Sequence, residues 1–350
     1  MANKLYRIGI VGASSLAGKE LSDELAESLL ATSNVVLLDD EEDAAGQVTT
    51  AGEEPAFIQR IESESFERMD FVFFTGDAEI TRRHWQEARR AGASIVDLTY
   101  ALEREKDVLV LSPWVNEALG ERARGREPDL RTPAVVAAHP AAVMLAMIAA
   151  RLSARMEIAS VAATVLEPAS EHGRAAMDEM HQQTVSLLSF QSLPREQYDA
   201  QVSFNLLPTL GEGARVRLGP TERRIRSEYA GFSDGALPPL ALQMVQAPVF
   251  HGYVVSVLVE LRKPATVKEV EGALEGDHID LVTGASEPPS NLSAAGQEDI
   301  MVRVMGDFEE AERGTRFWLW MASDNLKLAA LNAIACAAEL RRLRPSGKVQ

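Results

Sequence analysis

The chain of 350 residues is 46% hydrophobic and 25% charged, and its formal net charge is −17. Such an acidic surface repels nucleic-acid phosphates and excludes nucleic-acid binding as the main role. The apolar run at residues 141–150 is shorter than the roughly 20 residues that a membrane-spanning helix needs, and no secretory signal precedes the first strand. A single cysteine, Cys336, provides neither a disulfide framework nor a cysteine metal cluster. We therefore expect a cytoplasmic globular protein that makes no membrane contact and is long enough for two domains.

The first hundred residues alternate between strand and helix signals. Short apolar runs predict strands, and apolar side chains at helical spacing predict the helices between them. The expected strands cover residues 6–11, 35–38, 69–74 and 94–98, and the expected helices cover residues 19–30 and 79–90. Strand and helix in series predict a Rossmann-type, doubly wound parallel sheet. The polar segment 120–132 is expected to be a loop or linker.

The stretch VVAAHPAAVMLAMIAARL, residues 135–152, predicts a short strand, a sharp turn at Pro140 and an apolar helix. Many α/β enzymes hold a nucleophile or oxyanion donors at a turn of this kind. Here the turn offers only Ala141 and Ala142, whose side chains carry no reactive group. The sequence thus predicts a catalytic platform without a catalytic residue.

A second architecture is expected after residue 152. Longer apolar runs predict a mixed sheet, with strands at residues 161–166, 245–261, 300–305 and 316–321. Helices are expected at residues 174–188 and 267–274, a loop at 285–297, and a last helix at 324–343 with Ser323 or Asp324 as N-cap. The predicted fold class is therefore α/β plus α+β: a Rossmann-type doubly wound parallel sheet and a second, mixed-sheet domain.

The segment GASSLAG follows the first strand and opens the first helix, which is the context of a dinucleotide-binding turn. The usual middle glycine is replaced by a serine, so a plain strand-to-helix turn remains an alternative. Under the binding hypothesis, the residues that approach the pyrophosphate are Gly12, Ser14, Ser15, Leu16 and Gly18.

Five consecutive carboxylates, residues 39–43, follow the second predicted strand. A carboxylate at this place, here Asp39, binds a ribose 2′-hydroxyl in NAD proteins, whereas a 2′-phosphate needs Arg or Lys. The residues make no cofactor certain; they permit NAD and disfavour NADP. A solvated acidic loop is the simpler alternative.

Taken in order, several segments make the chain resemble the aspartate-semialdehyde dehydrogenase family over nearly its full length. These segments are IGIVGASSLAGKEL, DFVFFTG, SIVDLT, VVAAHPAAVM, EPASEHGRAAMDEM, VSFNLLP, TERRI, QAPVFHGYVVSV and SDNLKLAALNAIACAAEL. The resemblance implies an NAD(P)-binding domain of residues 1–138 with 324–350, and a dimerisation and substrate domain of residues 139–323. It also implies a homodimer and an enzyme that uses NADP.

The family's reaction uses a Cys thiolate nucleophile, a His for proton transfer, a Gln, an Arg that binds the substrate carboxylate, and a basic group for phosphate. The resemblance implies that each of these positions is replaced in this chain. The replacements fall on Ala142 (Cys), Tyr253 (His), Glu167 (Gln), Gln246 (Arg) and Glu103 (phosphate Arg), and an acidic substrate contact falls on Thr221. This pattern predicts that no catalytic residues remain, leaving a Cys-less homologue without dehydrogenase activity.

Two hypotheses follow. The first, which we favour, is a non-catalytic homodimer that binds a dinucleotide or another small-molecule ligand. The second is an enzyme of altered chemistry, such as another oxidoreductase of amino-acid biosynthesis, that uses a Glu/His/Tyr cluster. The cluster comprises His139, Glu167, His251 and Tyr253, with His172 nearby in the sequence. Its alternative interpretation is polar residues that fill a redundant cleft, and no helical ligand spacing indicates a metal site.

The remaining aromatic and thiol residues favour structural roles. His84 and Trp85 lie on an Arg-rich helix and are expected at the surface or in packing between domains. Trp318 and Trp320 alternate on a strand, which predicts one core face or an interface. We expect dimerisation through a partly apolar outer face of the second sheet. Cys336 is expected to be a buried, unreactive thiol.

Overall fold

The computed structural model describes residues 6–28, 30, 34–40, 46–51, 54–62, 64–123, 127–307 and 312–343. The chain forms two compact units. The first unit comprises Met1–Pro113, Arg124–Ala138 and Ala329–Gln350. The second unit comprises Trp114–Ala123 and His139–Leu328. Most of the acidic run 39–43 lies outside the described residues.

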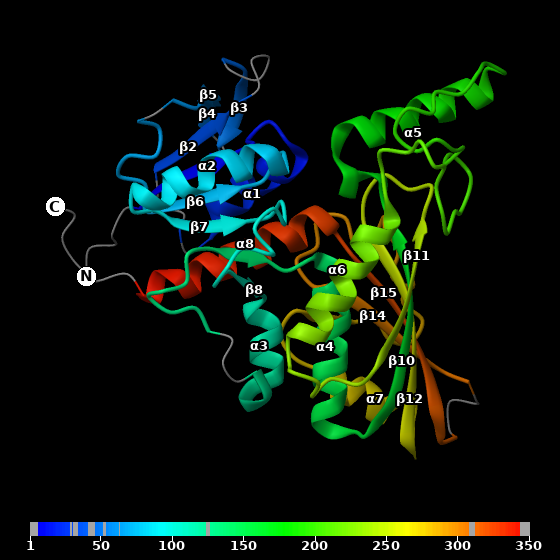
Figure 1. Ribbon diagram of the computed structural model, residues 1–350. Coiled ribbons are helices and arrows are strands. Elements are labelled where there is room, and N and C mark those ends of the chain that lie inside the picture. Colours follow the sequence, from blue (N-terminus) through cyan, green and yellow to red (C-terminus); the bar gives the residue numbers. More distant parts are fainter. Residues whose placement is uncertain are drawn as a thin grey trace. The chain divides into compact units, whose positions relative to one another are not determined.

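A parallel sheet forms the centre of the first unit (Figure 1). Its strands in spatial order are β5 (Gln59–Arg60), β2 (Asn34–Asp39), β1 (Arg7–Val11), β6 (Phe71–Phe74), β7 (Ser94–Asp97), β9 (Val135–Ala137) and β8 (Leu109–Leu111). Each neighbouring pair in this order is parallel. A separate antiparallel hairpin, β3 (Val48–Ala51) and β4 (Glu54–Phe57), was not expected from the sequence. The predicted Rossmann-type sheet is confirmed.

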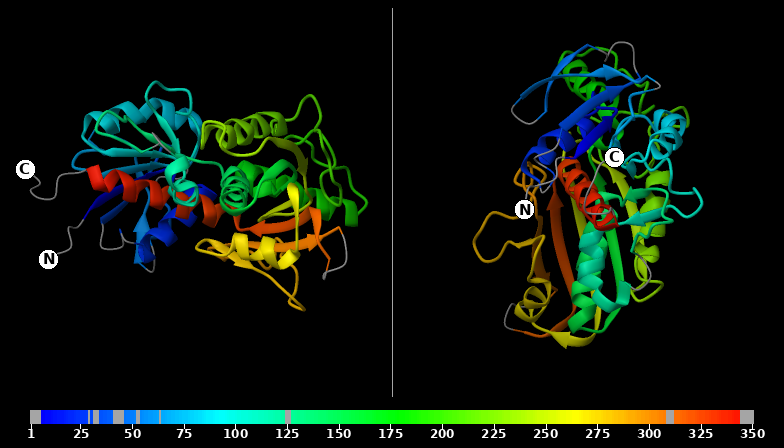
Figure 2. Two further views of the ribbon diagram at one scale, coloured as in Figure 1. Left: turned by 90° about the horizontal axis from the view of Figure 1, so that it is seen from below. Right: turned by 90° about the vertical axis from the view of Figure 1, so that its left-hand side faces the viewer.

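Helices cover both faces of this sheet (Figure 2). Along β6, Phe71 and Phe73 contribute to the core beneath α1 (Leu16–Glu27) and α8 (Asn325–Leu343), whereas Val72 and Phe74 contribute to the core beneath α2 (Ala78–Arg90). This alternation follows from the two-residue period of a strand. The sheet is therefore doubly wound, as its continuous apolar strands predict.

Helix α8 returns from the far end of the chain to the first sheet. Its apolar residues from Ala330 to Leu340 pack in the same core as Ile8 and Ile10. Cys336 is fully buried there, its Sγ lies 3.5 Å from the carbonyl oxygen of Leu111, and burial raises the pKa of its thiol. The Asp324 carboxylate accepts hydrogen bonds from the backbone of the first helical turn, which confirms the predicted N-cap.

A mixed sheet forms the second unit. Its strands in spatial order are β11 (Leu240–Gln246), β10 (Ile158–Glu167), β12 (Tyr253–Ala265), β15 (Gly314–Ser323), β14 (Ile300–Gly306) and β13 (Ile279–Leu281). The outer pairs at each edge are parallel and the inner pairs are antiparallel. The helical elements are α3 (Pro113–Leu119), η1 (Gly120–Ala123), α4 (Pro140–Arg155), η2 (Ala169–His172), α5 (Gly173–Leu188), α6 (Leu218–Gly231) and α7 (Val267–Leu274).

One predicted strand of this sheet was wrong. The run 245–261 is not a single strand but parts of β11 and β12, separated by residues 247–252. Pro248 lacks the N–H that a strand ladder needs, and Gly252 has a left-handed backbone conformation with a φ of 85°. Both strands pair with β10, one parallel and one antiparallel.

The two faces of the mixed sheet differ. Helix α4 contacts β10 and helix α6 contacts β11, so these helices lie on one face (Figure 1). Residues 140–150 of α4 are all buried, as expected for a helix enclosed on every side.

None of the helices that the structure describes is long and apolar enough to span a membrane.

Candidate functional site

The turn between β1 and α1 has the tight backbone of a nucleotide loop. Gly12 has φ of 80°, and a Cβ built on it would lie 2.4 Å from the backbone nitrogen of Gly76. A Cβ on Gly18 would lie 2.4 Å from the carbonyl oxygen of Gly12. Ser15 replaces the middle glycine and serves as the N-cap of α1, since its Oγ accepts the Gly18 N–H at 2.9 Å. The serine thus stabilises the helix terminus that a pyrophosphate would approach.

Few backbone N–H groups of this loop are available to a ligand. Ser15 N donates to Gly12, and Ser14 N donates to the carboxylate of Asp39. The N–H groups of Leu16 and Ala17, at the first two helical positions, have no partner among the described residues. A phosphate would therefore bind at these two N–H groups.

Asp39, the candidate ribose ligand, is already engaged within the protein. It is buried at the end of β2, and its Oδ2 accepts from Ser14 Oγ at 2.7 Å and from Ser14 N at 3.2 Å. A ribose hydroxyl would have to replace Ser14 as the donor to this carboxylate.

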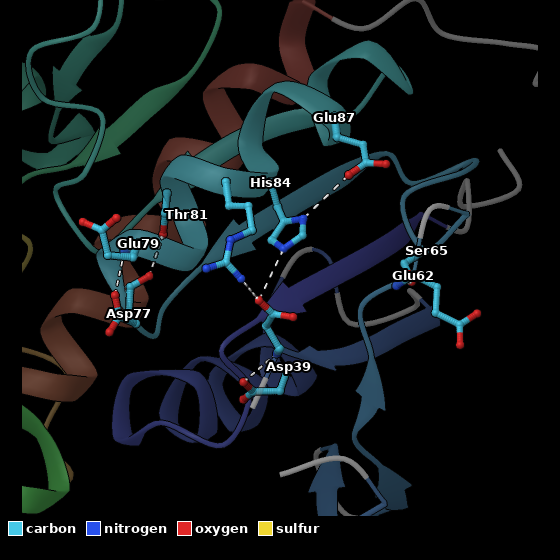
Figure 3. Close-up of polar contacts among 10 residues, drawn as sticks. Asp39, Glu62, Ser65, Asp77, Glu79, Thr81, His84 and Glu87 are labelled. Atoms are coloured by element: carbon cyan, nitrogen blue, oxygen red, sulfur yellow. Dashed lines mark hydrogen bonds and ion pairs between the residues drawn. The ribbon is translucent and has the colours of Figure 1, made fainter. Parts of the chain in front are cut away.

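The next carboxylate, Asp40, lies against helix α2. It pairs with Arg83, and His84 Nε2 lies 3.7 Å from its Oδ2. The other ring nitrogen of His84 lies 3.6 Å from Glu87 (Figure 3). Trp85, in contrast, is buried in the core of the first unit. A carboxylate at Asp40 would repel a 2′-phosphate.

In the second unit, four polar residues end neighbouring strands on the helix-covered face. Gln246 is paired with Glu167 in the parallel ladder of β11 and β10, and Tyr253 is paired with Ser323 across β12 and β15. All four side chains are buried. Paired residues of adjacent strands point to the same face, so the register brings the replaced Gln, Arg and His positions together.

Helix α4 brings His139 and Ala142 to this end of the sheet. His139 is the N-cap of α4, and its Nδ1 accepts the Ala141 N–H at 3.2 Å. Because Nδ1 accepts a hydrogen bond, the ring proton is on Nε2. Ala142 is fully buried in the first turn, where it offers only a methyl group.

The ring proton of His139 faces a carboxylate that the sequence analysis missed. Nε2 of His139 lies 3.0 Å from Oε1 of Glu171, and the Tyr253 hydroxyl lies 3.4 Å from the same nitrogen. Since Nε2 already holds a proton, Tyr253 donates its own to Glu171. Glu171 stands beside His172 in the quoted segment EPASEHG, so its position was visible, but its partner was not.

A second ion pair adjoins the first. His172 Nε2 lies 2.9 Å from Oε2 of Glu167. Burial alone lowers the pKa of His172, but attraction to Glu167 and Glu171 outweighs it and raises that pKa. Burial likewise raises the pKa of Glu171, but His139, His172 and the Tyr253 hydroxyl together lower it to about 2. The network therefore favours the charged form of both residues, Glu171 as a carboxylate and His172 as an imidazolium.

The other expected residues make no hydrogen bond or ion pair with this network among the described residues. His251 makes no hydrogen bond or ion pair with the residues that the structure describes. Thr221 is buried in α6, and Glu103 belongs to the first unit, 3.9 Å from Arg104. Glu228 of α6, which was not expected, accepts the backbone N–H of His139 at 2.8 Å. Across the described residues, no group of three or more His, Cys, Asp or Glu side chains has the arrangement of a metal site.

A Rossmann-type unit completed by the C-terminal helix, together with a mixed-sheet unit, defines a two-domain protein of the dehydrogenase class. The chain belongs to the semialdehyde dehydrogenase family. The family's NAD binding domain matches residues 7–122, and its dimerisation domain matches residues 150–328.

Its relatives include proteins with two different names. The "USG-1 protein homolog" of Pseudomonas aeruginosa is 30% identical, over 93% of this chain and 95% of the relative. The aspartate-semialdehyde dehydrogenase of Rickettsia bellii is 26% identical, over 96% of this chain and 98% of the relative. A solved structure of a probable aspartate-semialdehyde dehydrogenase from Pseudomonas aeruginosa has a TM-score of 0.83 at 28% identity, covering 97% of this chain and 99% of that one.

Proposed function

We propose that this protein is a non-catalytic, homodimeric member of its family that binds a small ligand. The observation that carries the proposal is Ala142, which is fully buried at the turn where the family resemblance places the nucleophile. A methyl group cannot attack an acyl carbon or hold a thioester, so covalent catalysis is lost.

The surroundings of Ala142 support the same conclusion. The ring proton of His139 is held by Glu171, and Nδ1 is held by the helix backbone. Gln246 is neutral, and its Nε2 donates to the carbonyl oxygens of Glu167 and Ala247. The side chain therefore cannot supply the cation that would bind a substrate carboxylate.

For the nucleotide loop, we propose weak NAD binding in preference to NADP. The N–H groups of Leu16 and Ala17 suit a pyrophosphate, and a nicotinamide dinucleotide bound there would supply a hydride acceptor or donor. The Ser14–Asp39 hydrogen bonds oppose ribose binding, because a bound ribose must replace them. Asp40 adds repulsion toward a 2′-phosphate.

For dimerisation, we propose the face of the mixed sheet that lies opposite α4 and α6. Met305 and Trp318 are cross-strand partners on β14 and β15, and they are 43% and 42% exposed. A paired Met and Trp on an open sheet face is typical of an interface rather than of a solvated surface. The family's dimerisation domain, which matches this unit, supports the assignment.

The test is turnover of aspartate semialdehyde with phosphate and either NAD or NADP, followed by the absorbance of the reduced nicotinamide. The aspartate semialdehyde dehydrogenase II of Vibrio cholerae, whose structure has been solved in complex with ASA, serves as positive control under the same conditions. We expect no rate above a blank without protein. Because the missing groups act as a unit, a measurable rate would overturn the non-catalytic assignment.

A further inference from the structure

Buried carboxyl groups outnumber cations around the end of β10. Glu228 accepts the backbone N–H of His139, whose Nε2 faces Glu171, and His172 pairs with Glu167. These contacts place three carboxyl groups beside two histidines, of which His172 has the raised pKa. Nδ1 of His139 accepts the Ala141 N–H and its single ring proton, on Nε2, faces Glu171, so His139 does not balance the excess charge.

A fourth carboxyl group extends this network on the side of α5. Glu179 is buried and accepts the backbone N–H groups of Gln197 and Tyr198 at 2.7 and 3.1 Å. Burial raises the pKa of the Tyr198 hydroxyl, and the carboxylates of Glu167 and Glu179 raise it further. Tyr198 therefore lies in the negative field of both groups.

The same place contains buried polar atoms that have no hydrogen-bond partner. Oε1 of Glu167, Oε1 of Gln246 and the hydroxyl of Tyr198 are all inaccessible and have no partner among the described residues. Glu167 and Gln246 are register partners, so their side chains lie side by side on one face. A buried polar group without a partner destabilises the fold, and native proteins leave few of them.

We propose that the site formed by Glu167, Gln246 and Tyr198 binds the protonated amine of a small molecule, which rests on the non-catalytic, ligand-binding function proposed above. A primary ammonium has three N–H donors and no acceptor, which matches two acceptor oxygens and a hydroxyl. It also supplies the positive charge that the carboxyl groups lack. A water molecule would satisfy the hydrogen bonds but not the charge.

The family resemblance places at the Gln246 position an Arg that binds a substrate carboxylate. The proposed ligand group at this position is instead a cation. No arrangement for a metal ion occurs among the described residues, which favours an organic cation over a metal ion. The network reaches the surface at η2, where the side chains of Glu171 and His172 are 13% and 18% exposed. Movement of this short turn would admit the amine.

The experiment is calorimetric titration of the full chain with putrescine at neutral pH. Two compounds are titrated in parallel. Tetramethylammonium is also a cation but has no N–H donor, and succinate is an anion. We expect saturable putrescine binding, at least tenfold weaker binding of tetramethylammonium and no binding of succinate. Glu167→Gln keeps the shape but removes the charge and should weaken putrescine binding at least tenfold. Glu157→Gln, at an exposed position in the same unit, should leave it unchanged.

Three results would overturn the proposal: no putrescine binding by the wild-type chain, equal binding of tetramethylammonium, or undiminished binding by folded Glu167→Gln. The comparison of the two cations uses only the wild-type chain, so it decides the matter even if the variant does not fold. Turnover of aspartate semialdehyde is measured on the same preparation. Turnover would overturn the proposed function, whereas an inactive chain that ignores putrescine overturns the amine site alone.

Discussion

His139 and Glu171 form a buried pair in which the ring nitrogen Nε2 lies 3.0 Å from the carboxylate oxygen Oε1. The pair joins the N-cap of α4 to the turn η2, so it fixes the first turn of the helix that carries Ala142. Both nitrogens of His139 are thereby occupied, one by the helix backbone and one by Glu171. Ala142 therefore lies beside a network that stabilises the fold rather than beside a free base.

Restoring the nucleophile alone should not restore activity. In Ala142→Cys the thiol would be buried, His139 would remain bound to Glu171, and no cation would replace Gln246. We expect aspartate-semialdehyde dehydrogenase activity to stay at the level of the blank, as measured by reduction of either nicotinamide cofactor. A rate clearly above that of the wild-type chain would show that the rest of the site is still competent.

Glu171 should make stability depend on acid pH. Its pKa of about 2 lies below its ordinary value of 4.5, so its contribution is complete above about pH 4.5 and is lost as the pH falls toward 2. Glu171→Gln should lower the free energy of unfolding at neutral pH by about 1–3 kcal/mol and flatten its acid dependence. Urea midpoints measured across this pH range test both effects; an unchanged acid slope contradicts the assignment.

His172 should titrate above its ordinary value and only while Glu167 is charged. Its raised pKa means that its contribution to stability is complete below about pH 6.5 and is lost as the pH rises through the folded-state pKa. Nitrogen-detected NMR titration of the imidazole measures that pKa. Glu167→Gln removes the first of the two attracting carboxylates, so the pKa of His172 should fall in this variant; an unaltered titration would argue against the pair.

The nucleotide loop should tolerate no side chain at Gly12. Its φ of 80° and the 2.4 Å approach of a built Cβ to Gly76 N predict that Gly12→Ala costs about 2–4 kcal/mol. Gly92 has a similar φ of 97° but open space around its Cβ position, so Gly92→Ala should cost only about 1–2 kcal/mol. Equal losses in thermal or urea unfolding would mean that the close approach is unimportant.

The exposed sheet face should control dimerisation. Trp318→Glu places a charge on each copy of the interface and should weaken the dimer at least tenfold, which light scattering over a dilution series detects. Leu130→Glu is the control, since Leu130 is 86% exposed in the first unit. A wild-type monomer at micromolar concentration, or a Trp318→Glu variant that dimerises normally, contradicts this interface.

The sequence determined the two architectures and the absence of a reactive side chain at Ala141 and Ala142. Apolar strands alternating with helices predicted the parallel sheet, because both faces of such strands must be covered. The apolar C-terminal helix likewise needed an apolar partner, and the core around Ile8 supplies it. The lack of a nucleophilic atom at Ala142 was visible without coordinates, because residue identity alone decides whether such an atom exists.

Only the tertiary structure decided which polar groups meet. The sequence offered His139 and Glu167 as members of one possible cluster, but His139 faces Glu171, because η2 turns this carboxylate toward α4 while β10 directs Glu167 toward His172. Likewise, the sequence made Asp39 a candidate ribose ligand, whereas its carboxylate accepts the Ser14 hydroxyl. A hydrogen bond between distant segments forms only if its donor and acceptor atoms are placed to within a few tenths of an ångström. Periodicity along the chain determines only the face of a helix or strand on which a residue lies.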